Sequence, residues 1–346
     1  MRRRRPPALW ALLLLAVTVV AACGDDDEGA EGSAADGEIT LYSGRVEELV
    51  QPLIDRFEEK TGITVEVRYG NSAEMGAALL EEGEDTPADV FYSQEVGAVG
   101  VLAKADLLAP LPEATVERVD ERFRPPDGNR WVGVTGRSRV IVYNPDLVAE
   151  PPTSVLELTD PKYRGQTAWV PSNAGFQAFI TAFRVSEGEE AARQWLEDMK
   201  ANGVQAYGDN VEVLTAVDAG DLPMGLINHY YWARLRGERG GEENMKARLI
   251  FPEGDDPGAL VNATAVAITA GAADDPDAAA FVEHLLSDEG QAHFVTETFE
   301  YPLVDGVADP AGLPPLDELG GPPLDLTDLD SLEATQQLLT GAGLLS

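Results

Sequence analysis

Three short β runs, each followed by a helical pattern, are the feature of this 346-residue chain that most constrains its fold. The β runs cover residues 38–43, 63–69 and 88–93, and they contain the β-branched and aromatic residues typical of strands. After the first run, the apolar residues of 47–60 recur at helical spacing. This order predicts an α/β fold in which a mainly parallel sheet is flanked by helices and ligands bind beyond the carboxyl ends of the strands.

The length of the chain predicts two lobes, because 346 residues exceed what one ordinary hydrophobic core accommodates. Two apolar runs, Trp131–Thr135 and Arg139–Asn144, are joined by residues 136–138 and are interpreted as the crossing into a second lobe. Residues 262–269 are interpreted as the return. The predicted boundaries are 38–137 plus 262–302 for the first lobe and 138–261 plus 303–346 for the second.

The N-terminus has the pattern of a lipoprotein signal peptide over residues 1–22. Four arginines precede an apolar run, and the small residues that end it precede Cys23, which resembles a bacterial lipobox. Cys23 is then the expected site of lipidation, and the acidic residues 23–37 form a flexible tether. The alternative is an ordinary signal peptide with an incidental cysteine. Since Cys23 is the only cysteine, the sequence offers no disulfide framework, no zinc–thiolate site and no cysteine nucleophile.

The net charge of −36 restricts the partners. A surface of this charge repels nucleic acid, so no nucleic-acid partner is expected. A cation would be attracted by the general field of the protein. An anionic ligand would require locally concentrated positive groups.

One motif, Asn228-His229-Tyr230-Tyr231-Trp232, follows a short apolar run and ends it with an amide, an imidazole and two adjacent phenols. By itself the motif indicates no more than the aromatic end of a strand. The two tyrosines could equally be amphipathic residues at an interface. The rest of the chain has to decide between these interpretations.

Five segments in one consistent order resemble the periplasmic ferric-ion-binding proteins, the substrate-binding components of iron ABC transporters. They are Ile39–Gly44, Pro87–Ser93, Gly136–Tyr143, Ile227–Trp232 and Asp256–Val261. The resemblance spans about residues 38 to 304. It implies the two-lobed periplasmic-binding-protein type II fold, which closes around a ligand in the cleft between the lobes.

The resemblance implies that Tyr230 and Tyr231 bind ferric iron as phenolates. Fe³⁺ is a hard cation that prefers anionic oxygen, and a bound metal can displace the proton of a phenol whose pKa is about 10. Consecutive residues of an ideal strand point to opposite faces, so both phenols reach one ion only where the backbone turns from strand to helix.

The resemblance also implies a synergistic anion, for which phosphate, carbonate and citrate are candidates. The matching anion-binding residues are Ser172, Asn173, Ala174 and Gly175 in one loop, together with Asn210 and Asn228. A strand that opens into a helix N-terminus presents free N–H groups to an anion. Arg137 or Arg139 could add positive charge. The alternatives are plain helix capping for the loop and a structural salt bridge at the hinge for the arginines.

Two positions depart from the family pattern. Some members use a histidine and a glutamate where this chain has Val46 and Gln94. Valine cannot ligate and glutamine is a weak neutral donor, but Glu47 and Glu95 lie one position away and could substitute if the register shifts. His229 is expected to face away from the metal. We therefore expect iron bound with anions or as a ferric chelate.

Other functions remain open on the sequence. The same fold could bind sulfate, phosphonate, a sugar, a polyamine or thiamine. A surface-anchored hydrolase is disfavoured because the chain has no Gly-x-Ser-x-Gly motif, and a purely structural lipoprotein would not need a cleft. The expected protein is therefore not an enzyme. It is a monomeric, lipid-anchored receptor at the outer face of the cytoplasmic membrane, with an ABC permease and ATPase as partners.

Overall fold

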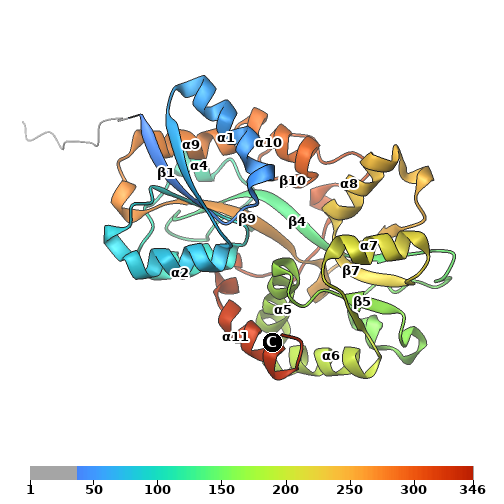
Figure 1. Cartoon of the computed structure of the whole chain (residues 1–346). Helices are drawn as coiled ribbons and strands as arrows, with labels where there is room; N and C mark the ends of the chain where they lie inside the picture. Colours follow the sequence, from blue (N-terminus) through green and yellow to red (C-terminus); the bar gives the residue numbers. More distant parts are fainter. Residues whose placement is uncertain (1–36, 346) are drawn as a thin grey trace, which may run out of the picture. The chain divides into compact units, whose positions relative to one another are not determined.

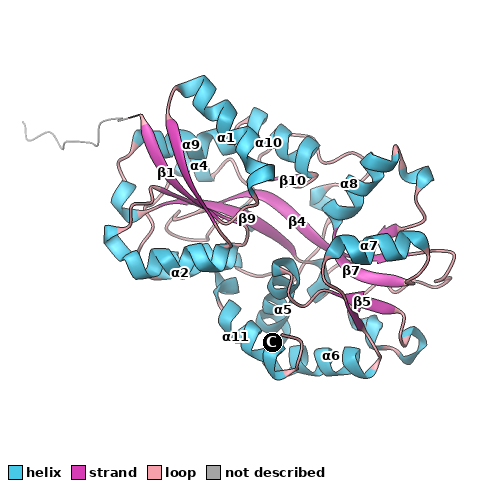
Figure 2. Ribbon diagram, viewed as in Figure 1, coloured by secondary structure: helices cyan, strands magenta, loops and turns pink. Residues whose placement is uncertain are grey.

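The computed structural model describes residues 37–345, so Cys23, the signal peptide and most of the tether lie outside the described residues. Ten strands form one continuous sheet in the order β2-β1-β3-β9-β4-β7-β5-β6, with β8 and β10 paired to β4. Strand β4 (Val132–Tyr143) belongs to both halves of the sheet, because its first part pairs with β9 and its second part with β7. Figure 2 shows β4 as one unbroken strand between the two halves.

The first lobe contains the three predicted strands in parallel pairing, with β1 between β2 and β3. Strand β9 runs antiparallel to both β3 and β4. Helices α1, α9 and α10 lie above this sheet in Figure 1, and α2 lies below it. The elements are β1 (Glu38–Ser43), α1 (Glu47–Thr61), β2 (Thr64–Tyr69), α2 (Ser72–Glu82), β3 (Val90–Ser93), α3 (Val96–Lys104), α4 (Glu113–Val116), β9 (Val261–Ile268), α9 (Pro276–Leu285), α10 (Asp288–His293) and β10 (Tyr301–Pro302).

The second lobe packs helices on both faces of its strands. Successive side chains of β4 point to opposite faces of the sheet. Ile141 therefore packs in one hydrophobic cluster with Phe176 and Trp195, and Val140 and Val142 pack in another. The elements are β5 (Thr167–Trp169), α5 (Ala174–Glu187), α6 (Glu189–Ala201), β6 (Gln205–Ala206), α7 (Asn210–Ala219), β7 (Met224–Asn228), α8 (His229–Arg239) and β8 (Arg248–Ile250).

The two runs interpreted as the crossing between the lobes form one strand together with the residues that join them. Residues 136–138 continue the strand, because they pair with Ala263, Asn262 and Val261 of β9. Glycine at position 136 fits this crowded strand, where an added Cβ would lie 3.1–3.3 Å from Leu303, Val261 and Tyr301. Residues 136–138 therefore form part of the crossing strand and pack closely between the lobes.

The C-terminal segment contacts both lobes. Leu303, Leu319 and Leu329 belong to the same hydrophobic cluster as the first-lobe strands, whereas our boundaries placed them in the second lobe. Leu338 and Leu339 of α11 (Leu332–Gly341) pack in a second-lobe cluster. The chain therefore passes between the lobes a third time, near residue 331.

Candidate metal and anion site

The tyrosine pair lies where β7 ends and α8 begins. Asn228 is the last residue of β7, and Tyr230 and Tyr231 are in the first turn of α8. A helical turn separates successive side chains by about 100°, so both rings can face the same side. Their centroids are 4.5 Å apart with an interplanar angle of 36°. Both tyrosines line a cavity of about 590 Å³ that is also lined by residues of the first lobe, including Val46 and Gln94.

The phenol of Tyr230 is held in its neutral form in the absence of a bound cation. Burial raises its pKa above the ordinary value of 10, and the neighbouring Tyr231 raises it further, while the charge of Arg137 opposes them. A cation that binds here must therefore displace a proton. The amide of Asn228 lies beside this phenol, and its Nδ2 donates to the Tyr230 hydroxyl at 3.4 Å.

His229 faces away from the cavity, as expected. Its Nδ1 accepts a hydrogen bond from the backbone N–H of Ser138 at 3.1 Å, so its Nε2 carries the proton and donates to the carbonyl of Phe299 at 2.9 Å. Burial lowers the pKa of His229 to about 4. A neutral imidazole with both nitrogens bonded to the backbone orients the start of α8 and is not available to a metal.

The loop predicted to hold an anion forms the N-terminus of α5. Asn173 caps the helix, since its Oδ1 accepts from the N–H of Phe176 at 3.2 Å. Asn173, Ala174 and Gly175 line the same cavity as the tyrosines, and Ser172 lines an adjoining chamber. Gly175 permits close packing, because a Cβ there would lie 2.8 Å from Nδ2 of Asn228.

A buried chain of hydrogen bonds runs from Arg139 through Asn228 to Tyr230 of the tyrosine pair. Arg139 donates from Nη1 to Oδ1 of Asn228 at 3.1 Å and from Nη2 to the carbonyl of Leu226 at 2.9 Å. Burial lowers the pKa of Arg139 to about 10. In contrast, Asn210 is buried at the start of α7 and is not among the residues that line either described cavity.

The candidate carboxylates do not face the tyrosines. Glu95 pairs with Arg137 at 3.0 Å and accepts a hydrogen bond from Asn262, and it lines the adjoining chamber. Burial raises the pKa of Glu95, although Arg137 lowers it in part. Glu47 is exposed at the start of α1 and is absent from the described lining of the cavity. Gln94 does line it, with its Oε1 accepting from Nη1 of Arg45 at 2.7 Å.

Sequence reasoning missed the ion pair of Arg45 and Glu300, which lies in the wall of the cavity. Two hydrogen bonds join the side chains, at 3.1 Å and 2.8 Å. Glu300 also accepts from the hydroxyls of Thr135 and Thr298 at 3.0 and 3.1 Å. Burial alone would raise the pKa of Glu300, but Arg45 and Arg137 outweigh it and lower that pKa. The partners are 255 positions apart, so no local pattern could have indicated the pair.

Within residues 37–345, no group of three or more His, Cys, Asp and Glu side chains could hold a metal ion. The same part of the chain contains no helix that is long and apolar enough to span a membrane.

Comparison with known proteins defines the class. Residues 85–319 match the family described as bacterial extracellular solute-binding protein. The chain is 38% identical over 320 residues to the Fe(3+)-binding periplasmic protein of Serratia marcescens, covering 92% of this chain and 94% of that protein. Because these matches cover most of the chain, the protein belongs to the solute-binding proteins, which are not enzymes.

Solved structures extend the comparison to the fold. Iron-bound HitA from Pseudomonas aeruginosa is 34% identical, with a TM-score of 0.80 covering 88% of this chain and 99% of that one. The Trichodesmium protein IdiA (FutA), solved with iron and citrate ligands, is 27% identical, with a TM-score of 0.73 and coverage of 88% and 99%. The chain belongs to the family of periplasmic ferric-ion-binding proteins, and the predicted two-lobed type II fold is confirmed.

Proposed function

We propose that this protein binds ferric iron through the phenolate oxygens of Tyr230 and Tyr231, as an extracytoplasmic receptor of iron uptake. The observation that carries the proposal is the pair of adjacent phenols on one wall of an interlobe cavity. The names of the Serratia and Pseudomonas relatives, which describe iron binding, support the choice of metal.

The protein supplies two anionic oxygens in this scheme, and exogenous ligands complete the coordination. Val46 cannot ligate, Gln94 is held by Arg45, and Glu95 is held by Arg137. We propose that an anion such as phosphate, carbonate or citrate binds against the N-terminus of α5. The N–H groups of Ala174 and Gly175 begin that helix, where negative charge is favoured. Citrate accompanies iron in the Trichodesmium relative.

The buried charges around the site favour an anion beside the metal. Arg45 is paired with Glu300, and Arg137 with Glu95, whereas the guanidinium of Arg139 contacts only neutral acceptors among the described residues. Arg139 therefore leaves one positive charge without a carboxylate partner. An anion with two or more negative charges would offset both this charge and the excess charge of the iron–phenolate centre.

We further propose that the loaded protein delivers its ligand to an ABC permease and ATPase. Lipidation at Cys23 would hold the monomeric receptor at the outer face of the cytoplasmic membrane through the acidic tether. Mass spectrometry of the mature N-terminus tests the anchor: a diacylated Cys23 is expected, and an unmodified residue at a different N-terminus would contradict it.

The metal assignment is tested by iron titration of the purified protein with citrate, phosphate or carbonate present. We expect one iron per chain and a visible phenolate-to-iron charge-transfer band. The double variant Tyr230→Phe, Tyr231→Phe should lose the band. Tyr143→Phe is the matched control, because Tyr143 lies at the far end of β4 and is not among the cavity residues. A band that survives in the double variant would disprove the site, and tight binding of a different small ligand without iron would favour another receptor of the same fold.

A further inference from the structure

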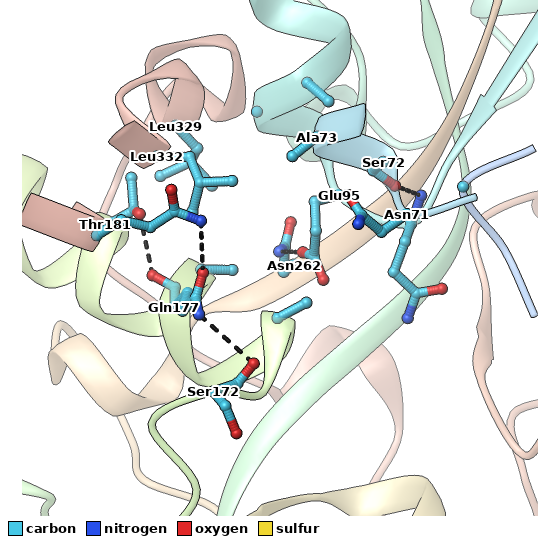
Figure 3. A pocket seen from close by; sticks show the side chains of 17 residues that line it. Asn71, Ser72, Ala73, Glu95, Ser172, Gln177, Thr181, Asn262, Leu329 and Leu332 are labelled. Atoms are coloured by element: carbon cyan, nitrogen blue, oxygen red, sulfur yellow. Dashed lines mark hydrogen bonds between the residues drawn. The ribbon is translucent and has the colours of Figure 1, made fainter. Parts of the chain in front are cut away.

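A second chamber of about 290 Å³ adjoins the tyrosine cavity. Gly44, Asn71, Gln94 and Ala174 line both spaces, so the two are neighbours and share a wall. Figure 3 shows the chamber, with Ala73 on one side and Gln177 and Thr181 on the other. Its volume is near the lower end of the range for small-molecule pockets, about 300 Å³.

The chamber is closed on one side by the C-terminal strap, which we define as residues 326–341. Leu329, Leu332 and Gln336 of the strap line the chamber. The strap fits tightly against α3, since a Cβ at Gly97 would lie 2.3 Å from the carbonyl oxygen of Leu329. It is joined to α5 by hydroxyls of Thr181 and Thr335 that are 2.7 Å apart. The chamber therefore has walls from both lobes and from the segment that connects them.

The lining of the chamber forms hydrogen bonds but carries no uncompensated charge. No lysine or arginine is among its described lining residues, and its one carboxylate, Glu95, is paired with Arg137. The polar groups are amides and hydroxyls, such as Gln177, which accepts from Nε2 of Gln336 at 3.2 Å. Short or aliphatic side chains, including Ala73 and Leu329, fill the remaining surface. A charged group in the chamber would lose hydration without gaining a partner of opposite charge. An uncharged group that bears a hydroxyl or amide would gain hydrogen bonds from the polar lining and apolar contacts from the aliphatic lining.

The tyrosine cavity offers the opposite chemistry. Besides the two phenols and the N-terminus of α5, its lining includes the ion pair of Arg45 and Glu300 and the charged side chains of Glu48 and Arg234. The N-terminus of α5 and bound iron favour an anionic iron-binding group there, and an uncharged extension is favoured next to it. The two spaces together match one molecule with two chemically distinct ends.

We propose that the chamber is a subsite for the uncharged, hydroxyl- or amide-bearing tail of an organic ferric chelate whose anionic head binds iron beside Tyr230 and Tyr231. This inference rests on the proposed function, because the head must be held by the tyrosine site. It names the substrate class as an iron complex with an organic ligand larger than the inorganic anions.

Two probes that share one head test the subsite. Glycolate and gluconate both bind iron through an α-hydroxycarboxylate, and gluconate adds a chain of uncharged hydroxyls. Two or more new hydrogen bonds predict that the full-length chain binds ferric gluconate on the order of tenfold more tightly than ferric glycolate. Affinity is measured by titration of the charge-transfer band, with each complex preformed at the same ligand excess.

Variants that fill the chamber separate its effect from the stability of the complexes in solution. Ala73→Leu and Ala98→Leu each add a side chain at the lining. The control is Ala77→Leu, which is exposed on the same helix as Ala73 and is not a lining residue. We expect the filled variants to lose the preference for gluconate and to bind ferric glycolate as the unaltered protein does.

The outcomes distinguish the two proposals. An unchanged ratio of gluconate to glycolate affinity in both filled variants would overturn the subsite and identify the chamber as space left between the lobes. The subsite is also overturned if the unaltered protein does not bind ferric gluconate more tightly than ferric glycolate. If neither complex produces a charge-transfer band in any variant, the tyrosine site itself fails.

Discussion

Replacing Glu300 by glutamine should destabilise the protein strongly, because it leaves a buried guanidinium without its counter-charge. The side chains of Arg45 and Glu300 are 0% and 3% exposed. Removal of one partner from a buried ion pair costs about 3–5 kcal/mol. Glutamine keeps an oxygen that can accept from Thr135 and Thr298, so the loss is attributed to the missing charge. We therefore expect the free energy of unfolding of Glu300→Gln to fall by about 3–5 kcal/mol.

Urea unfolding of the iron-free protein at pH 7 measures this loss. The matched control is Glu289→Gln, which breaks the exposed pair with Lys60, where the side chains are 46% and 62% exposed. An exposed pair contributes about 0–1 kcal/mol. A loss for Glu300→Gln that is no larger than the control's would refute the reasoning.

The pH dependence of the same pair has a defined sign. The folded pKa of Glu300 is lowered, so its contribution is fully present above the ordinary value of 4.5 and is lost as the pH falls through the folded pKa. The stability difference between the unaltered protein and Glu300→Gln should therefore shrink on acidification below about pH 4.5. A difference that stays constant down to pH 3 would contradict the assigned charge state.

Two further changes test other parts of the structure. Burial lowers the pKa of His284, so its contribution to stability is present above the ordinary value of 6.5 and is lost as the pH falls. His284→Gln should therefore make the unfolding midpoint decline less steeply between pH 7 and 5. A decline as steep as that of the unaltered protein would contradict this. Gly97→Ala should cost about 1–3 kcal/mol by forcing the strap away from α3. Gly341→Ala, which meets nothing within 4 Å, should be neutral or slightly stabilising in the same urea titration, and equal effects of the two changes would refute tight strap packing.

The sequence predicted the local elements of the first lobe well because each carries its own signals. Strand β1 is the predicted run, and α1 is followed by Gly62, whose φ of 78° is typical of a glycine that terminates a helix. The position of the tyrosine pair at the start of a helix was also predictable, since the motif and the expected strand-to-helix turn lie within a few residues. In contrast, residues 136–138 are of types common in turns, yet they lie within strand β4. They do so because they pair with residues of β9 that are more than 120 positions away in the sequence.

The surroundings of the site could not be predicted because they depend on distant pairs. Gln94 and Glu95 are adjacent in sequence, yet Gln94 accepts from Arg45 and Glu95 accepts from Arg137. These two arginines therefore fix the positions of side chains that line the two cavities. The strap was missed for the same reason. Its sequence is rich in leucine, and only the packed structure shows that Leu329 contacts one lobe and Leu338 the other.

The most direct test of the central claim is the resonance Raman spectrum of the iron-loaded protein, excited within its charge-transfer band. Iron bound to Tyr230 and Tyr231 predicts enhanced tyrosinate ring modes, which should weaken in Tyr230→Phe and in Tyr231→Phe and vanish in the double variant. Iron bound without enhanced tyrosinate modes, or modes that persist in the double variant, would contradict phenolate ligation by this pair.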